Sequence, residues 1–218
     1  MIELRRDGDV HILRLDEGEN RFSPGFLDEL EKILGELEAA DGPRALVTIG
    51  TGKFFSNGLD LDWLSRNPDE WGPYLRRVHA LFARFLTLPM PTVAALNGHA
   101  FAAGAMLALT HDYRVMRTDR GYFCLPEVDL GLSFTPGMAA LIQARLSKVT
   151  AHEAMVTGRR YGAEDACEAG IVHRSAPEAE VLATALAIAA PLAAKDGATV
   201  AKIRTVLYDA VLDTLRAG

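Results

Sequence analysis

The chain has 218 residues, of which 49% are hydrophobic and 24% are charged, and its formal net charge is −6 at pH 7. This composition is ordinary for a globular protein with a substantial core. The negative charge argues against a nucleic acid or an anionic membrane as partner, since both favour a basic surface. The two cysteines, Cys124 and Cys167, lack the spacing of metal ligands, so we expect no metal site. With no signal-peptide pattern and no apolar stretch long enough to span a bilayer, we expect a cytoplasmic location.

The first elements that the sequence predicts are a hairpin, a helix and a buried strand. Residues 2–15 contain two short apolar runs on either side of the turn 7–9, which is typical of a β-hairpin. Ser23 followed by proline marks a helix start, and apolar residues then recur at helical spacing over 26–37. The apolar run 45–49 predicts a strand that is covered on both faces of its sheet.

A second helix at 71–86 and a second buried strand at 92–96 repeat this order, so the sequence predicts an α/β fold. No change of composition marks a linker, and we expect one domain with a helical C-terminal segment. The later predicted elements are a strand at 113–116, a helix start at the capping box Thr150-Ala151-His152-Glu153, a helix at 162–169, a strand at 171–173, and helices at 177–194 and 197–216.

Two predicted strand-to-helix turns are poor in reactive side chains. The first is GKFFSNGLDLD at 52–62, and the second is GHAFAAGAMLAL at 98–109. Backbone N–H groups at a helix start attract negative charge, so two such turns side by side could donate one N–H each to a single oxygen, as an oxyanion hole does. Tight packing of helix on sheet would explain the same small residues. Neither turn has the spacing of a phosphate-binding or dinucleotide-binding loop.

These two turns, THDYRVM at 110–116 and FCLPEVDLGL at 123–132 resemble the signature segments of the crotonase (enoyl-CoA hydratase/isomerase) superfamily in order and spacing. Within it they are most similar to monofunctional Δ3,Δ2-enoyl-CoA isomerases of the plant peroxisomal type. The resemblance implies a crotonase-like spiral of ββα units with the acyl-CoA site over 1–190, and C-terminal helices over 191–218 in the same structural unit. It also implies a homo-trimer or a dimer of trimers and an acyl-CoA thioester substrate, with no cofactor because CoA is part of the substrate.

The resemblance assigns roles to individual residues. It places the two oxyanion donors at the backbone N–H groups of Leu59 and Ala103. Hydratases of the superfamily use two glutamates, whereas this chain has Met106 at one of those positions and keeps only Glu127 at the other. Methionine cannot activate water, so we expect a single-glutamate isomerase that moves a proton from C2 to C4 of a 3-enoyl-CoA. The remaining residues implied to bind substrate are Ser56, Asn57, Gly58, Asp60, Leu61, Ala102, Gly104 and Phe134.

The residues around Glu127 point to the same role independently. Most side chains between 123 and 130 are apolar, and burial raises the pKa of a carboxyl toward the range where it can both take and give a proton. An exposed glutamate at a strand-to-turn junction is the alternative that the residues alone leave open.

Other polar residues near the turns have simpler explanations. Asp60 and Asp62 are at a position where acids cap a helix, and His99 is expected to be a hydrogen-bonded structural histidine. Asp129 is considered as a second carboxylate because it follows Glu127 by two residues. Together these two acids would permit hydration. The same motifs would also suit thioester hydrolysis or a non-catalytic acyl-CoA-binding subunit.

Overall fold

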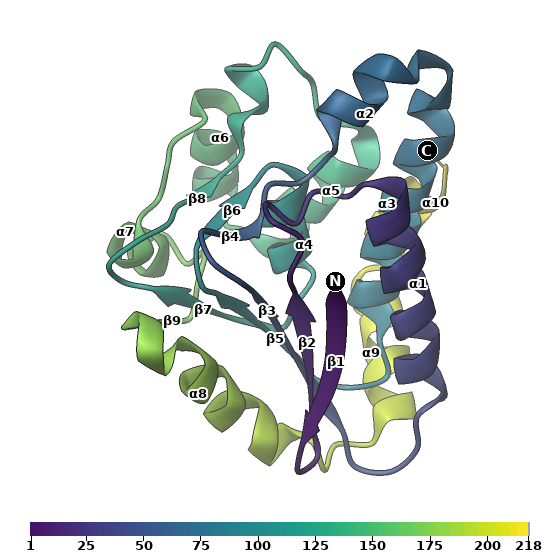
Figure 1. Ribbon diagram of the computed structural model, residues 1–218, viewed down its shortest axis with the longest axis vertical. Helices are drawn as coiled ribbons and strands as arrows, with labels where there is room; N and C mark the ends of the chain where they lie inside the picture. The colour runs from purple at the N-terminus through teal and green to yellow at the C-terminus, as the bar shows by residue number, and fades with distance from the viewer. Residues whose placement is uncertain (218) are drawn as a thin grey trace.

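The computed structural model describes residues 1–217, which form two β-sheets surrounded by helices (Figure 1). The strands are β1 (Ile2–Asp7), β2 (Val10–Leu15), β3 (Ala45–Gly50), β4 (Phe54–Ser56), β5 (Thr92–Leu96), β6 (His99–Phe101), β7 (Tyr113–Arg117), β8 (Phe123–Cys124) and β9 (Arg174–Ala176). Within the described residues the larger sheet has the order β1-β2-β3-β5-β7-β9 and the smaller one β4-β6-β8. β1 is antiparallel to β2, as the hairpin prediction requires, and the other paired strands are parallel.

Helices cover both faces of the larger sheet. They are α1 (Pro24–Ala39), α2 (Leu61–Arg66), α3 (Trp71–Thr87), α4 (Ala103–Leu109), α5 (Pro136–Arg145), α6 (Lys148–Thr157), α7 (Ala163–Glu168), α8 (Glu178–Ala189), α9 (Gly197–Leu207) and α10 (Asp209–Ala217), with short 3-10 turns η1 (Pro68–Glu70), η2 (Pro126–Val128) and η3 (Ala190–Leu192). The predicted start of α1 is confirmed, because the Ser23 side chain accepts a hydrogen bond from the Phe26 N–H at 3.2 Å.

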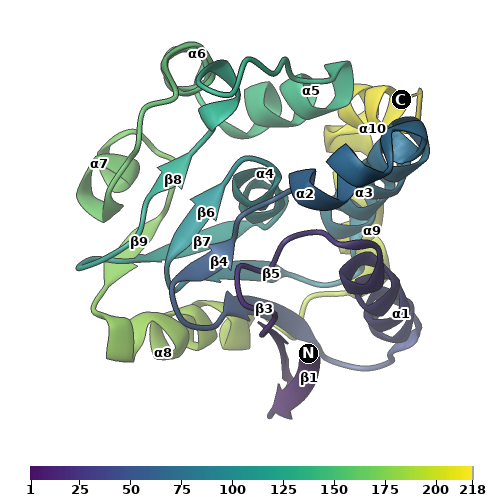
Figure 2. The same ribbon diagram turned by 45° about the horizontal axis from the view of Figure 1, so that its top comes forward.

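β3 lies at the centre of the larger sheet and is buried along its whole length, as its apolar sequence predicts. Its side chains alternate between the two faces: Ala45, Val47 and Ile49 pack in the cluster under α8, whereas Leu46 packs in the main core with α1, α3 and α4. Figure 2 shows α8 on one side of this sheet and the smaller sheet with α4 on the other. Both faces of the sheet are therefore covered.

The chain alternates between the two sheets as it advances. β3 leads into β4, β5 into β6 and β7 into β8, and helices α2 and α3 follow β4 while α4 follows β6. This is the ββα spiral that the resemblance implied. Because β4, β6 and β8 are parallel neighbours, the segments that follow them emerge at one end of the smaller sheet.

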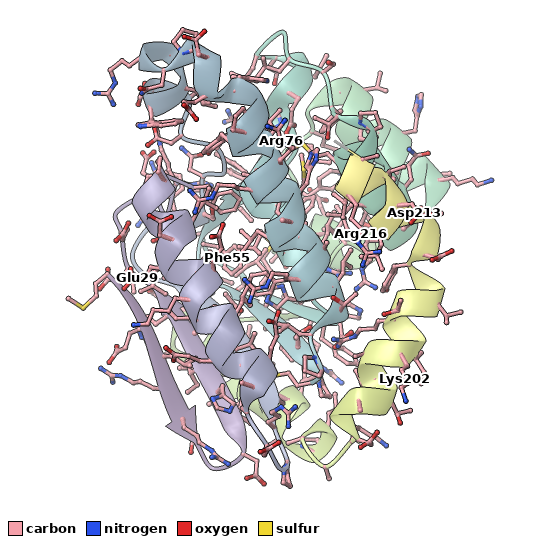
Figure 3. All side chains as sticks on the ribbon, turned by 90° about the vertical axis from the view of Figure 1, so that its right-hand side faces the viewer. Glu29, Phe55, Arg76, Lys202, Asp213 and Arg216 are labelled. Carbon is pink, nitrogen blue, oxygen red and sulfur yellow. The ribbon has the colours of Figure 1, made fainter. Side chains whose placement is uncertain are left out.

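The C-terminal helices complete a layer beside this spiral. α9 packs against α3, and α10 packs against α3 and α5. Figure 3 shows Lys202 on α9 and Asp213 and Arg216 on α10 at the surface of this layer. Arg204 anchors α9, since it donates to the Leu88 carbonyl at 2.6 Å and pairs with Asp112.

Among the described residues no single helix is long and apolar enough to cross a membrane. The segment Glu178–Leu192 and helix α9 (Gly197–Leu207) are long and apolar enough only when taken together, and the chain bends by 103° between them.

Three predicted element boundaries are wrong. The capping box at Thr150 lies inside α6, because Ser147 caps this helix by accepting from the Thr150 N–H at 3.1 Å. The strand predicted at 171–173 begins at Arg174, since the apolar residues before it are buried in the core instead of pairing with β7. The helix predicted over 197–216 breaks at Tyr208 into α9 and α10.

Candidate active site

The two small-residue turns meet at the end of the smaller sheet, backbone against backbone. Gly58 has a φ of +79°, and a Cβ there would lie 2.8 Å from the Ala103 nitrogen. A Cβ on Gly104 would lie 2.3 Å from the Ser56 carbonyl oxygen. Real Cβ atoms do not approach other atoms so closely, so both positions require glycine. The small residues therefore allow the two turns to pack directly on each other.

The N–H groups of Leu59 and Ala103 are among the backbone amides of these turns that have no acceptor within residues 1–217. Ala103 is the first residue of α4, so its N–H cannot bond within the helix. The residue before it, Ala102, has φ 49° and ψ −125°, a conformation that is strained for a residue with a side chain. The Ala102 N–H bonds to the Cys124 carbonyl at 3.0 Å, which holds this conformation in place.

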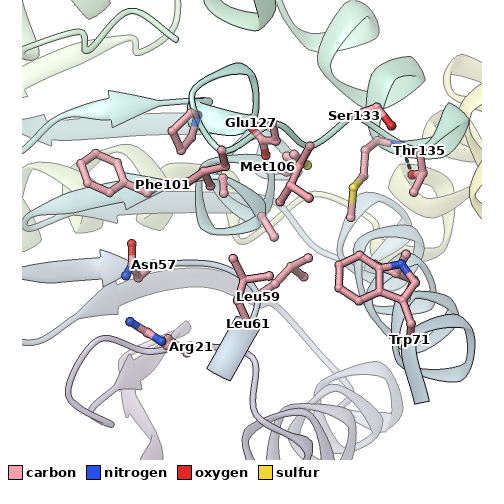
Figure 4. A pocket seen from close by; sticks show the side chains of 17 residues that line it. Arg21, Asn57, Leu59, Leu61, Trp71, Phe101, Met106, Glu127, Ser133 and Thr135 are labelled. Atoms are coloured by element: carbon pink, nitrogen blue, oxygen red, sulfur yellow. Dashed lines mark hydrogen bonds between the residues drawn. The ribbon is translucent and has the colours of Figure 1, made fainter. Parts of the chain in front are cut away.

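A cavity of about 310 Å³ lies next to both amides (Figure 4). Figure 4 shows Arg21, Asn57 and Phe101 toward one end of it, and Trp71 and Thr135 toward the other. Six of the residues predicted from the sequence line this cavity: Asn57, Leu59, Leu61, Ala102, Ala103 and Glu127.

Glu127 is the only acid among the described residues that line the cavity. It lies on η2 with 7% of its surface exposed, and its buried Oε2 has no hydrogen-bond partner within residues 1–217. Burial raises the pKa of Glu127 to about 7, with a smaller opposing effect from a backbone hydrogen bond. Met106 lines the same cavity and is buried, whereas Asp129 is exposed and lies outside the lining. Asp129 is therefore not a second carboxylate beside Glu127.

Several predicted substrate-binding residues support the turns from outside the cavity. Ser56 is fully buried, and its hydroxyl donates to the Asn20 carbonyl at 2.7 Å and accepts from the Gly58 N–H at 3.2 Å. Asp60 caps α2 by accepting from the Trp63 N–H at 3.0 Å. The Ser56 and Asp60 side chains are thus hydrogen-bonded within the protein, and Ser56, Gly58, Asp60 and Gly104 do not line the cavity.

Phe134 also lies outside the lining, and its side chain packs against the core. Its two neighbours, Ser133 and Thr135, face the cavity instead. The prediction chose the one of these three consecutive residues that does not line the cavity.

The sequence reasoning missed the cavity residues contributed by distant segments. Trp71 and Leu75 are one turn apart on α3, and this i, i+4 spacing was the available signal that both face one direction. Met138 comes from α5, which was not predicted. Arg21 reaches the cavity edge and pairs there with acids, at 2.7 Å from Glu19 and 2.6 Å from Asp62.

His99 lies beside the second turn among aromatic rings. Its ring centroid is 5.4 Å from that of Phe54, 4.9 Å from Phe101 and 5.6 Å from Tyr122. Burial, followed by nearby cations, lowers the pKa of His99. Its buried Nδ1 has no hydrogen-bond partner within residues 1–217, so ring packing rather than the expected hydrogen bonding holds it.

The described residues contain no group of three or more His, Cys, Asp or Glu side chains that could hold a metal ion.

The chain matches the family model of enoyl-CoA hydratase/isomerase over residues 6–218. It belongs to this family. Among curated relatives it is 40% identical to enoyl-CoA delta isomerase 2, peroxisomal, of Arabidopsis thaliana, over 95% of this chain and 92% of that protein. It is 33% identical to enoyl-CoA delta isomerase 1, peroxisomal, of the same plant, over 97% and 91%. A solved enoyl-CoA isomerase of Mycobacterium tuberculosis matches with a TM-score of 0.90 at 26% identity, over 99% of this chain and 94% of that chain.

These comparisons confirm the family and the fold that the motifs indicated, and they correct the expected location. The cytoplasmic prediction is wrong, because both of these Arabidopsis isomerases are named as peroxisomal proteins. Composition and the lack of a long apolar segment do not distinguish one aqueous compartment from another, which is why they misled here.

Proposed function

We propose that this protein is an acyl-CoA isomerase that moves the double bond of a 3-enoyl-CoA to the conjugated 2-enoyl position. The observation that carries the proposal is a single buried carboxyl, that of Glu127, in a cavity that also contains two amides without acceptors. The two relatives named as enoyl-CoA delta isomerases support the same reaction.

The amides of Leu59 and Ala103 receive the thioester oxygen. When a proton leaves C2, negative charge moves onto this oxygen, and two N–H donors already held in place stabilise it without reorganisation. Support comes from the close packing of the two turns, which leaves both N–H groups beside one cavity. Losing one donor of this kind costs on the order of 10²–10³ in rate in enzymes that use an oxyanion hole.

The Glu127 carboxylate takes the proton from C2 and returns it to C4. The C2–H electron pair forms the enolate; as the carbonyl re-forms, C2=C3 is made and the electrons of C3=C4 take the proton at C4. No oxidant, reductant or separate cofactor enters this balance, and CoA is part of the substrate. A carboxyl with a pKa of about 7 suits both steps near neutral pH.

Hydration is the alternative within the family, and the site offers it no second carboxyl. Met106 is buried beside the cavity, and Asp129 is exposed outside it. A lone carboxyl can transfer a proton between two carbons but lacks a partner to orient water for addition.

We also propose a homo-oligomer, either a trimer or a dimer of trimers. Three exposed apolar side chains on α9, those of Ile203, Val206 and Leu207, support a contact between copies of the chain. Light scattering of the purified protein measures the mass in solution; a monomer would contradict this proposal without affecting the proposed reaction.

The test of the reaction is the ultraviolet absorbance of the conjugated thioester formed from a 3-enoyl-CoA. We expect Glu127→Gln to lower kcat by roughly 10²–10⁴, the range for losing a general acid–base group. Glu168→Gln is the matched control, because Glu168 is exposed on α7. Undiminished conjugation by Glu127→Gln would refute the proposed role.

A further inference from the structure

Three apolar side chains that line the active-site cavity are also exposed to solvent. Trp71 at the start of α3 is 40% exposed, and Leu130 and Leu132 in the loop after η2 are 53% and 37% exposed. All three also line the cavity that contains Glu127. We call these three residues the rim. Exposed apolar side chains that continue a ligand cavity commonly mark a binding groove.

The wall at Thr135 is polar and fixed. Thr135 Oγ1 lies 2.8 Å from Nε2 of His79 and accepts from the Met138 N–H at 3.2 Å, which caps α5. His79 is 2% exposed, so the core begins directly behind this wall. A hydrocarbon chain at Thr135 therefore meets a buried polar pair, whereas the rim offers it exposed apolar side chains.

The two ends of the cavity differ in charge. The cation Arg21 lies with Asn57 and Phe101 at one end, and the uncharged Trp71 and Thr135 lie at the other, with Glu127 between them (Figure 4). If the reacting carbons lie at Glu127, as the proposed function requires, the polar CoA portion lies toward Arg21. The acyl chain then extends toward Trp71 and the rim.

We infer that the tail of the acyl chain leaves the cavity across the rim, so that the site accepts and prefers acyl chains longer than the cavity holds. This inference rests on the proposed function for the direction in which the substrate lies. The occupant of the rim is the substrate itself, because the rim is continuous with the cavity in which the chemistry occurs.

Each methylene that the rim covers should raise kcat/KM by up to about fourfold, which corresponds to about 0.8 kcal/mol per buried methylene. The tail lies far from C2 and C4 and binds equally in the ground and transition states. The gain should therefore appear as a lower KM with an unchanged kcat.

The experiment measures kcat/KM for 3-enoyl-CoAs whose acyl chains contain from about six to about sixteen carbons. The longest of these chains extend several methylenes beyond the cavity. We expect kcat/KM of the wild type to keep rising for the longer chains, and Leu130→Ser with Leu132→Ser to flatten that rise. Val128→Ser is the matched control: Val128 is an apolar side chain in the same segment, 46% exposed, but it does not line the cavity. The control should keep the full dependence on chain length.

The affinities of saturated acyl-CoAs of the same lengths, measured by calorimetry, give a second readout that needs no turnover. If none of the 3-enoyl-CoAs is converted to its conjugated isomer, the proposed isomerase activity is refuted. An affinity for saturated acyl-CoAs that rises with chain length and depends on the rim would still support this inference. Isomerisation of short chains with no gain from length would refute the inference alone. A rim variant could instead show a lower oligomer mass in solution and an unchanged dependence of kcat/KM on acyl-chain length. That result would mean that the rim contacts a second copy of the chain, and it would overturn the inference about the acyl chain.

Discussion

The ionisation of Glu127 should lower the stability of the folded protein, and Glu127→Gln should remove this effect. Burial raises the pKa of Glu127 from its usual 4.5 to about 7. One pKa unit corresponds to about 1.4 kcal/mol, so the difference corresponds to about 3 kcal/mol of unfolding free energy. Glutamine has nearly the same shape but stays neutral, and it therefore isolates the cost of the buried charge.

The direction in which the unfolding free energy changes with pH follows from which state, folded or unfolded, keeps the proton of Glu127. Below pH 4.5 the carboxyl is neutral in both states, and its ionisation costs nothing. Between 4.5 and about 7 the folded protein keeps a proton that the unfolded chain has released, so stability falls as the pH rises. Above about 7 both states are ionised and the full cost remains. The advantage of Glu127→Gln should thus grow across this window and then stay constant.

Urea unfolding followed by tryptophan fluorescence, at intervals from about pH 4.5 to about pH 8.5, measures this difference. Other groups titrate equally in both proteins and cancel. We expect the difference in unfolding free energy to grow by about 3 kcal/mol, or roughly 6–12 °C in Tm for a chain of this size. A difference that stays the same at every pH would show that the Glu127 carboxyl titrates normally, and would remove the physical basis for its returning a proton near neutral pH.

Two further predictions concern activity. The kcat/KM for a 3-enoyl-CoA should fall as the pH drops below about 7, because only the ionised Glu127 takes the C2 proton; a rate that holds steady down to pH 4.5 would contradict the raised pKa. Gly104→Ala should lower kcat by roughly 10²–10³, because its Cβ would lie 2.3 Å from the Ser56 carbonyl oxygen and push the two amide-bearing turns apart. Gly25→Ala is the control, since nothing lies within 4 Å of a Cβ there; equal loss in both variants would refute this reasoning.

Elements with strong local signals were predictable from the sequence. The Ser23 cap and the apolar run of β3 each carry their information within a few residues, and both are confirmed. β4 and β6 are three residues long and lie within the two turns, so no period is visible in them. Their pairing joins residues more than forty positions apart, such as Phe54 and His99. Such contacts are decided by the packing of the whole chain.

The residues of the candidate site also fall into those that the sequence predicts locally and those that only the packing of the chain brings together. The motifs placed Leu59, Ala103 and Glu127 at one cavity because those residues lie within the motif segments themselves. Trp71 and Leu75 reach the cavity only because α3 packs beside it, and no motif marks either residue. Sequence reasoning therefore located the proposed chemistry but not the walls that select the acyl chain.

The apolar walls and the proton transfer depend on each other. A cation near Glu127 would lower its pKa and weaken it as the acid that protonates C4. Arg21 is the only lysine or arginine among the described cavity-lining residues, and it is held at the edge by Glu19 and Asp62. The interior is left to side chains such as Met106 and Leu75, which keep water and charge away from the carboxyl. The same side chains offer an acyl chain its contact surface, so bound substrate should exclude more water and raise the pKa of Glu127 further.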